Sequence, residues 1–94
     1  MIQITKQATD HLLELRADKG LGRRVGIRFV RSGARMGLVF ADRPAAGDVV
    51  VPTEDVAVYV ASEIADVFDQ ATIDARIEDE RTRLVLRKSR HADP

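Results

Sequence analysis

The chain has 94 residues, of which 45% are hydrophobic and 32% are charged, and its formal net charge is zero. These values are ordinary for one globular domain, which we expect over residues 1–90, followed by a loose tail over 91–94. No apolar run approaches the length of a membrane span, and no basic start precedes a long apolar stretch, so we expect a cytoplasmic protein with no membrane partner.

The charges are segregated along the chain. Residues 1–41 contain eight basic and three acidic residues, residues 42–80 contain two and eleven, and residues 81–94 contain five and one. The three segments therefore carry net charges of +5, −9 and +4. If folding preserves this segregation, one face is basic and another acidic, which favours head-to-tail self-contact or a charged partner.

An amphipathic helix is predicted near the N-terminus. Thr5 is a suitable N-cap residue, and apolar residues from Ala8 to Leu15 recur at spacings of four and three. Gly20 is expected to end this helix. His11 lies beside the apolar stripe, where a residue at the edge of the core is the simplest interpretation.

Further along the chain, the hydrophobic period changes to two and predicts strands. The expected strands are 25–29, 36–41, 49–51, 56–60, 72–78 and 84–86, with Ile73, Ala75 and Ile77 facing inward. Between the expected strands 56–60 and 72–78, Ser62 is expected to cap a short helix whose inner face is formed by Ile64, Val67 and Phe68.

These elements predict an α+β domain. Helices are few and separated from several short strands, and most connections are too short for parallel crossovers. We therefore expect a compact, mostly antiparallel or mixed β-sandwich with one N-terminal amphipathic helix and one short helix.

The order of these elements resembles the HesB/IscA-type family of iron–sulfur cluster assembly proteins, the A-type carriers. The resemblance runs from Ile4 to about Lys88 and is carried by four stretches: residues 2–5, residues 25–28, residues 38–44 with Gly47-Asp48, and residues 71–74 with 84–86. It implies a HesB-like domain over residues 1–90.

Family members are similar in using three cysteines, one after the first core strand and two in a Cys-Gly-Cys near the C-terminus, to bind iron or an iron–sulfur cluster. This chain has no cysteine. The first ligand position falls on Ala34 or Arg31, depending on the alignment, and the chain ends at Pro94, about where the other two would begin. The resemblance therefore implies a divergent member that retains the scaffold without its thiolate ligands, and we expect no cofactor.

Other residues offer little catalytic or metal-binding chemistry. His91 is the only candidate metal ligand near the missing tail motif, and neither histidine has the spacing of a zinc or di-iron site. No nucleophile elbow or phosphate-binding loop occurs, so we expect no enzyme and no catalytic residue.

An arginine cluster is the remaining candidate surface. Arg28, Arg31 and Arg35 surround the first core strand and the loop after it, where they could bind carboxylates or phosphates. The simpler interpretation is a charged outer face that contacts the acidic 42–80 segment. With 4% aromatic residues and no stacking motif, nucleic acid is disfavoured as the partner.

Three hypotheses for function follow. The first, which we favour, is a non-enzymatic interaction or scaffold protein with a protein partner, a second copy of itself included, that binds no cluster. The second is an iron or cluster-assembly protein whose ligands are His91, acids or groups from a partner. The third is an anion- or nucleic-acid-binding module built on Arg28, Arg31 and Arg35.

Overall fold

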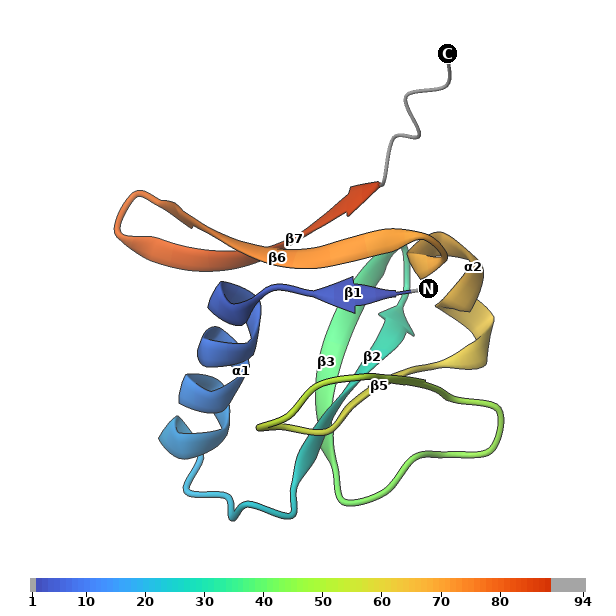
Figure 1. The fold of residues 1–94 in the computed structure, drawn as a ribbon, viewed down its shortest axis with the longest axis horizontal. Coiled ribbons are helices and arrows are strands. Elements are labelled where there is room, and N and C mark those ends of the chain that lie inside the picture. The colour runs from blue at the N-terminus through green and yellow to red at the C-terminus, as the bar shows by residue number, and fades with distance from the viewer. Residues whose placement is uncertain (1, 89–94) are drawn as a thin grey trace.

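The computed structural model describes residues 2–88, which form two β-sheets, one long helix and a short helical segment (Figure 1). The elements in chain order are β1 (Gln3–Ile4), α1 (Lys6–Asp18), β2 (Gly26–Ser32), β3 (Arg35–Ala41), β4 (Val49–Val51), β5 (Val58–Val60), η1 (Ser62–Ile64), α2 (Ala65–Phe68), β6 (Ala71–Glu78) and β7 (Arg81–Lys88). The tail predicted over 91–94 lies outside the described residues.

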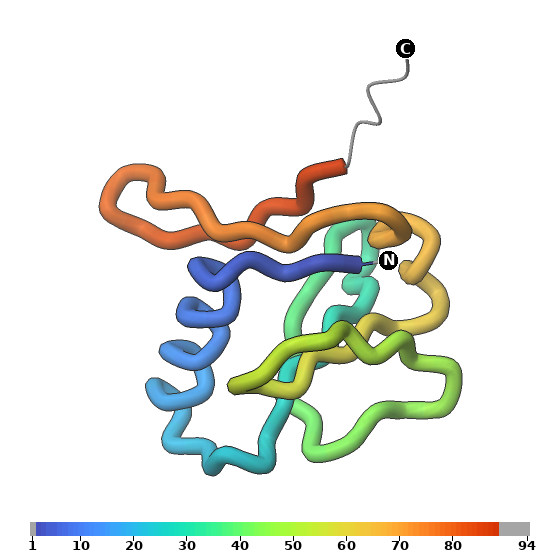
Figure 2. Tube along the Cα trace, viewed as in Figure 1, coloured from blue at the N-terminus to red at the C-terminus, as the bar shows by residue number. Residues whose placement is uncertain are grey.

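The two sheets are both mixed. A three-stranded sheet has the order β1-β6-β7, and a four-stranded sheet has the order β3-β2-β5-β4. The β6–β7 hairpin lies across one end of the four-stranded sheet, with α1 along one side of the molecule and α2 at the other (Figures 1 and 2). The predicted α+β class with few helices is confirmed.

Parallel strands are more prominent than we expected from the short connections. β1 pairs with β6 and β2 pairs with β5 in parallel, whereas the β2–β3, β4–β5 and β6–β7 pairs are antiparallel. The argument from short connections applies only to strands that follow one another in the chain. Both parallel pairs join strands that are separated by other elements, so no short crossover is required.

The α1 helix begins and ends where the sequence predicts. The Thr5 hydroxyl accepts a hydrogen bond from the Ala8 amide at 3.2 Å, which satisfies one unpaired donor of the first turn. Past its last residue, Gly20 has a φ of +69°. Buried Arg16 donates to the carbonyl oxygens of Arg23 at 3.3 Å and Val25 at 3.1 Å, and so fastens the helix to the start of β2.

The core lies between α1 and the facing sides of the two sheets. Its largest fully buried side chains are Phe68, Leu12, Ile27, Ile73, Val51, Val58 and Val60. Phe29 and Phe68 pack with their ring centroids 5.3 Å apart and their planes tilted by 56°, a favourable aromatic geometry. This pair joins β2 to α2.

Gly26 marks the closest approach of β2 to the segment before β5. A Cβ atom at this position would lie 2.6 Å from the carbonyl oxygen of Ala57 and 2.9 Å from its Cβ. That same carbonyl accepts a hydrogen bond from the Ile27 amide at 2.9 Å. Only glycine leaves room for the two backbones to meet here.

Four local predictions are wrong. Ile77 is 76% exposed rather than inward-facing, because the β6–β7 hairpin extends beyond the core. Val67 is also exposed, although Ile64 and Phe68 are buried as predicted. Ser62 does not cap the short helix: it is the first residue of η1, and the N-cap position falls on Ala61, which has no side-chain donor or acceptor. The predicted strand 56–60 begins only at Val58.

Candidate functional site

The β2–β3 hairpin is the place where the family resemblance puts the first cluster ligand. Ser32 pairs with Arg35, which leaves a two-residue loop, Gly33-Ala34, with a φ of +62° at Gly33. Glycine at the first loop position suits a type II′ turn. Ala34 is exposed, and the exposed Arg31 donates through its Nε to the carbonyl oxygen of Gly33 at 3.2 Å. Neither side chain is a soft ligand for iron.

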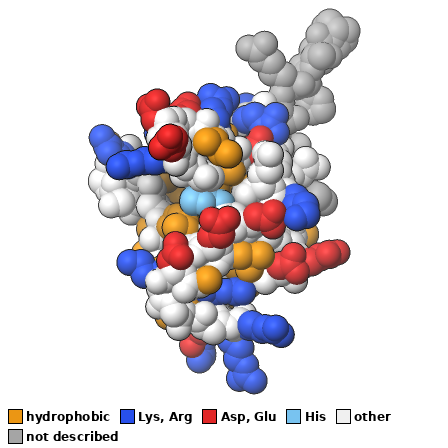
Figure 3. Space-filling model, turned by 90° about the vertical axis from the view of Figure 1, so that its left-hand side faces the viewer, with side chains coloured by type: hydrophobic (Ala, Val, Ile, Leu, Met, Phe, Trp, Pro, Cys, Tyr) orange, Lys and Arg blue, Asp and Glu red, His pale blue; other side chains and the backbone are white. Residues whose placement is uncertain are grey.

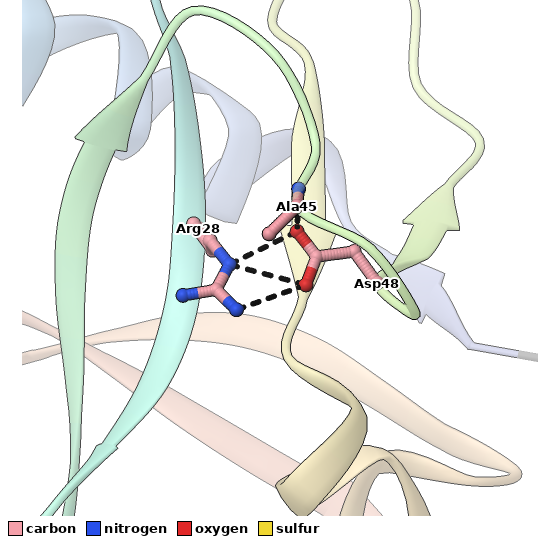
Figure 4. A network of polar contacts seen from close by, with 3 residues as sticks. All are labelled: Arg28, Ala45 and Asp48. Atoms are coloured by element: carbon pink, nitrogen blue, oxygen red, sulfur yellow. Dashed lines mark hydrogen bonds and ion pairs between the residues drawn. The ribbon is translucent and has the colours of Figure 1, made fainter.

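The guanidinium group of Arg28 forms an ion pair with the carboxylate of Asp48 in the same chain (Figure 4). Its Nε lies 2.9 Å from Asp48 Oδ2, and its Nη2 lies 3.0 Å from Asp48 Oδ1. The Asp48 side chain has no exposed surface, and its Oδ2 also accepts from the Ala45 amide at 2.8 Å. The Arg28 hydrogen bonds lower the pKa of Asp48, and the same bonds raise the pKa of Arg28.

The three candidate arginines are not equivalent. Alternation along β2 places Arg28 and Arg31 on opposite faces of the sheet, and the pairing of Ser32 with Arg35 places Arg35 on the face of Arg28. Arg28 neutralises Asp48, as the simpler interpretation of an outer face contacting the 42–80 segment expects. Only Arg31 and Arg35, at the exposed hairpin end, are left as candidates for a bound anion.

Ion pairs between the segments interleave the charges that the sequence segregates. Arg28 joins the first segment to Asp48 of the acidic one. In the β6–β7 hairpin, Arg83 lies 3.3 Å from Glu78, and Arg87 lies 3.0 Å from Asp74. The folded protein therefore does not keep the charge segregation of its sequence at these places.

Asp74 anchors the start of α1 to β6. Its Oδ1 accepts from the Thr5 hydroxyl at 2.7 Å and from the Ala75 amide at 2.8 Å. The Thr5 hydrogen bond is the main cause of a lowered pKa for Asp74. This carboxylate has a structural role, and the strand pattern of β6 gave no sign of its pairing with a residue so far away in the chain.

A cleft lies between the two sheets. It has a volume of about 530 Å³, and its lining is mostly apolar: Phe29, Met36, Gly37, Leu38, Phe68, Ile73, Leu84, Val85 and Leu86, with His11 and Arg83 as its polar side chains. Pockets of this size and character are typical of binding sites. Figure 3 shows hydrophobic side chains interrupting the charged surface around the histidine on this side of the molecule.

A second hollow continues this apolar surface along β3. Its volume is about 360 Å³, and Leu38 lines it together with Leu15, Ile27 and Phe40. Four hydrophobic residues of β3 are exposed by more than a third: Met36, Leu38, Val39 and Phe40. The sequence correctly predicted a strand here, but its alternation gave no indication that both faces carry exposed apolar groups.

Metal ligands do not gather anywhere in residues 2–88. In this range no group of three histidine, aspartate or glutamate side chains is placed to hold a metal ion. His11 is half-buried beside the cleft, and His91, the weak candidate ligand, lies outside the described residues. In the same range, no helix combines the length and apolar character needed to cross a membrane.

Comparison of the sequence with known proteins gives no match. A scan against protein-family models and a search of curated proteins both find nothing that matches the chain.

Comparison of the structure gives several matches. A crystal structure of IscA with the [2Fe-2S] cluster matches with a TM-score of 0.68 and 18% identity, over 94% of this chain and 85% of IscA. Escherichia coli SufA, involved in the biosynthesis of iron–sulfur clusters, matches with a TM-score of 0.68 and 20% identity, over 92% of this chain and 83% of SufA. An Aquifex aeolicus protein solved by NMR matches with a TM-score of 0.71 and 16% identity, over 94% and 91% of the two chains. The chain therefore has the fold of the IscA and SufA proteins, as its resemblance to the HesB/IscA-type family predicts.

Proposed function

We propose that this protein is a non-enzymatic interaction or scaffold protein with the HesB/IscA fold, which acts in the cytoplasm and holds no iron–sulfur cluster of its own. The observation that carries this proposal is the composition of the β2–β3 hairpin. Where the family has a thiolate, this chain has Ala34 or Arg31, and Arg31 already donates to a backbone carbonyl.

The residues present do not fit an iron–sulfur cluster. Clusters are held by cysteine thiolates, with histidine replacing only part of the set in some types. The sequence contains no cysteine, and its two histidines lie at positions 11 and 91. Arginine at the hairpin adds positive charge and cannot coordinate iron through a deprotonated group. The proposed function therefore does not include transfer of a cluster by this chain alone.

The cleft between the sheets supports a role in binding other proteins. An exposed apolar surface bordered by charged residues is a common feature of interaction sites. Here the apolar lining from β3 and β7 is bordered by Arg83 on the rim. A partner with an apolar segment would fit this surface.

Anaerobic reconstitution tests whether the chain holds a cluster. The purified protein is incubated with ferrous iron and sulfide, desalted, and assayed for both elements and for visible absorption, with E. coli SufA as the positive control. We expect SufA to gain charge-transfer absorption and this chain to gain none. Stoichiometric iron and sulfide on this chain would refute the proposal, and their loss in the His91→Ala or His11→Ala variant would identify a ligand.

Binding to a protein partner needs its own experiment. The immobilised chain is exposed to purified carriers and other iron–sulfur assembly proteins, and the bound fraction is measured by surface plasmon resonance. We expect binding that is weakened by Leu84→Asp, which places a charge in the cleft, and preserved by Thr82→Asp on the exposed part of the same strand. Equal binding by both variants would show that the cleft is not the interaction site.

The other two hypotheses are less well supported. Iron binding without cysteine would need several ligating side chains close together, and residues 2–88 contain no such group. An anion site would have to use Arg31 and Arg35 without Arg28, whose guanidinium is bound to Asp48. Binding to a polyanion that weakens with salt and is lost in the Arg31→Ala/Arg35→Ala variant would restore the anion hypothesis.

A further inference from the structure

A third hollow lies between α1 and the β6–β7 hairpin. It has a volume of about 320 Å³, and its lining residues are Gln7, Asp10, His11 and Glu14 from α1 with Ala75, Ile77 and Thr82 from the hairpin. His11 also lines the cleft between the sheets, so the two hollows meet at this residue. The cleft and the third hollow together are called the hairpin groove below.

The inner face of the β6–β7 hairpin forms one wall along the whole hairpin groove. Side chains alternate along a strand, so every second residue of β6 and β7 lies on this face. The face consists of three opposed pairs: Ile73 with Leu86, Ala75 with Leu84, and Ile77 with Thr82. The first pair lines the cleft and the last lines the third hollow. Ile77 comes four positions after Ile73, so this wall runs for about 13 Å along the strand.

An uncovered apolar side chain lies at the far end of this wall. Ile77 is 76% exposed, although it shares the inner face with the buried Ile73. A single exposed apolar residue is ordinary on a protein surface. Ile77 does not stand alone, because it continues the apolar row that begins in the cleft. The apolar surface that a ligand can cover therefore extends beyond the cleft to the outer part of the hairpin.

The hairpin groove is acidic where it passes α1. Asp10 and Glu14 both line it and are four positions apart, on one side of the helix. Asp10 lies 3.1 Å from Lys6 in an exposed pair, whereas no ion pair within residues 2–88 includes Glu14. Arg83 is the one arginine or lysine among the described lining residues, and its charge is balanced by Glu78 at 3.3 Å. Figure 3 shows acidic and hydrophobic side chains next to the histidine.

We propose that the hairpin groove binds an extended segment of a partner protein in which apolar residues are separated by about four positions from a lysine or arginine. The apolar residues fill the cleft against Leu38 and Leu84, and the basic side chain lies over Ile77 toward Glu14. Lysine and arginine suit this end because their aliphatic stems cover apolar surface while their charged heads stay in water. The inference rests on the proposed function and names the chemistry of its partner.

Charge complementarity favours a basic segment over an acidic one. The carboxylates of Asp10 and Glu14 would repel an acidic side chain placed over Ile77, and opposite charges across an interface select the correct partner and fix its register. A purely apolar segment would fill the cleft and leave the acidic end without a counter-charge. The order of chemistry along the groove, apolar and then acidic, therefore defines both the composition of the segment and its direction.

Fluorescence anisotropy with two labelled peptides tests this inference. The basic probe is Leu-Phe-Leu-Ser-Ser-Ser-Lys-Lys, and the acidic probe has glutamate in place of both lysines. We expect the wild-type chain to bind the basic probe saturably and the acidic probe at least about fivefold more weakly. Added salt should narrow this difference, because it screens exposed charges.

A charge-reversal variant separates recognition from a merely structural effect. Glu14→Lys should weaken binding of the basic probe at least about fivefold and strengthen binding of the acidic probe. The matched control is Glu54→Lys, which makes the same change of charge at an exposed residue outside the hairpin groove and should leave both affinities unchanged. Ile77→Ser should weaken the basic probe without loss of stability, since this side chain is exposed. Circular dichroism verifies that each variant is folded.

The outcomes that overturn the inference differ from those that overturn the proposed function. Equal affinities for the two probes, no saturable binding of either at about 1 mM protein, or equal effects of Glu14→Lys and Glu54→Lys would refute a basic partner segment. Binding of purified assembly proteins that is weakened by Leu84→Asp would in that case still support the cleft as an interaction site. Loss of that dependence on Leu84→Asp would refute the cleft itself.

Discussion

The contact between β2 and the segment before β5 can be tested by replacing Gly26 with alanine. The new Cβ would lie 2.6 Å from the Ala57 carbonyl oxygen, a distance that real Cβ atoms essentially never show, so the two backbones must separate. Overpacking of this kind costs about 1–3 kcal/mol. Weakening the bond from the Ile27 amide to the same carbonyl adds about 1 kcal/mol. Reduced entropy of the unfolded chain offsets about 0.4–1 kcal/mol.

We therefore expect Gly26→Ala to lower the free energy of unfolding by about 1–3.5 kcal/mol, compared with the roughly 5–15 kcal/mol typical of a domain. Urea denaturation followed by circular dichroism measures this change, and the m-value should stay constant. Gly22→Ala is the matched control: no atom lies within 4 Å of its Cβ position, so the variant should be unchanged or slightly stabilised. Equal stabilities of the two variants would refute the close approach and with it the parallel pairing of β2 with β5.

Three further predictions concern polar and turn residues. The hydrogen bonds from Arg28 lower the pKa of Asp48, and the stability that this shift contributes is present above the ordinary pKa of 3.8 and lost as the pH falls through the lower pKa of the folded protein. The difference in unfolding free energy between the wild type and Asp48→Asn should therefore narrow as acid is added. A constant difference would contradict the role of Arg28. Asp79 and Glu80 have φ values of 48° and 64°, as a type I′ turn requires, so Glu80→Gly should stabilise the β6–β7 hairpin by roughly 1 kcal/mol, seen as a higher Tm, whereas Glu80→Ala should not. Thr5→Ala should cost about 2–4 kcal/mol in urea denaturation, because it removes both the N-cap and the hydrogen bond to Asp74, and Thr5→Ser should recover most of this loss.

The sequence predicted the local elements well and their pairing less well. The α1 helix could be found because its N-cap, apolar spacing and terminal glycine are all local signals. The two-residue strand β1 was missed, since its only support is the parallel pairing of Gln3 and Ile4 with β6, almost 70 residues away. Hydrophobic periodicity reports which face of a strand is apolar. It does not report which strand is its neighbour.

The candidate site was predictable only in part, for the same reason. The absence of cysteine is evident from composition, and the structure adds that Ala34 and Arg31 lie exposed at the β2–β3 hairpin. Arg28 was grouped with Arg31 and Arg35 because they are near in sequence, yet strand alternation and the buried Asp48 separate it from Arg31. The exposure of Leu38 could not be predicted, because it depends on β3 lying at the edge of its sheet.

A chain that has this fold and no cysteine carries its remaining chemistry on its surfaces. The half-buried pair of Arg28 and Asp48 and the hydrogen bond from Thr5 to Asp74 hold the sheets and the helix in place, and neither lines the cleft. A fold that only needed to be stable would gain from a charge on β3, because exposed apolar edges invite aggregation. The uncharged run from Met36 to Ala41 therefore makes most sense if an interaction covers it, and this is the physical reason to seek the role of the protein in what it binds.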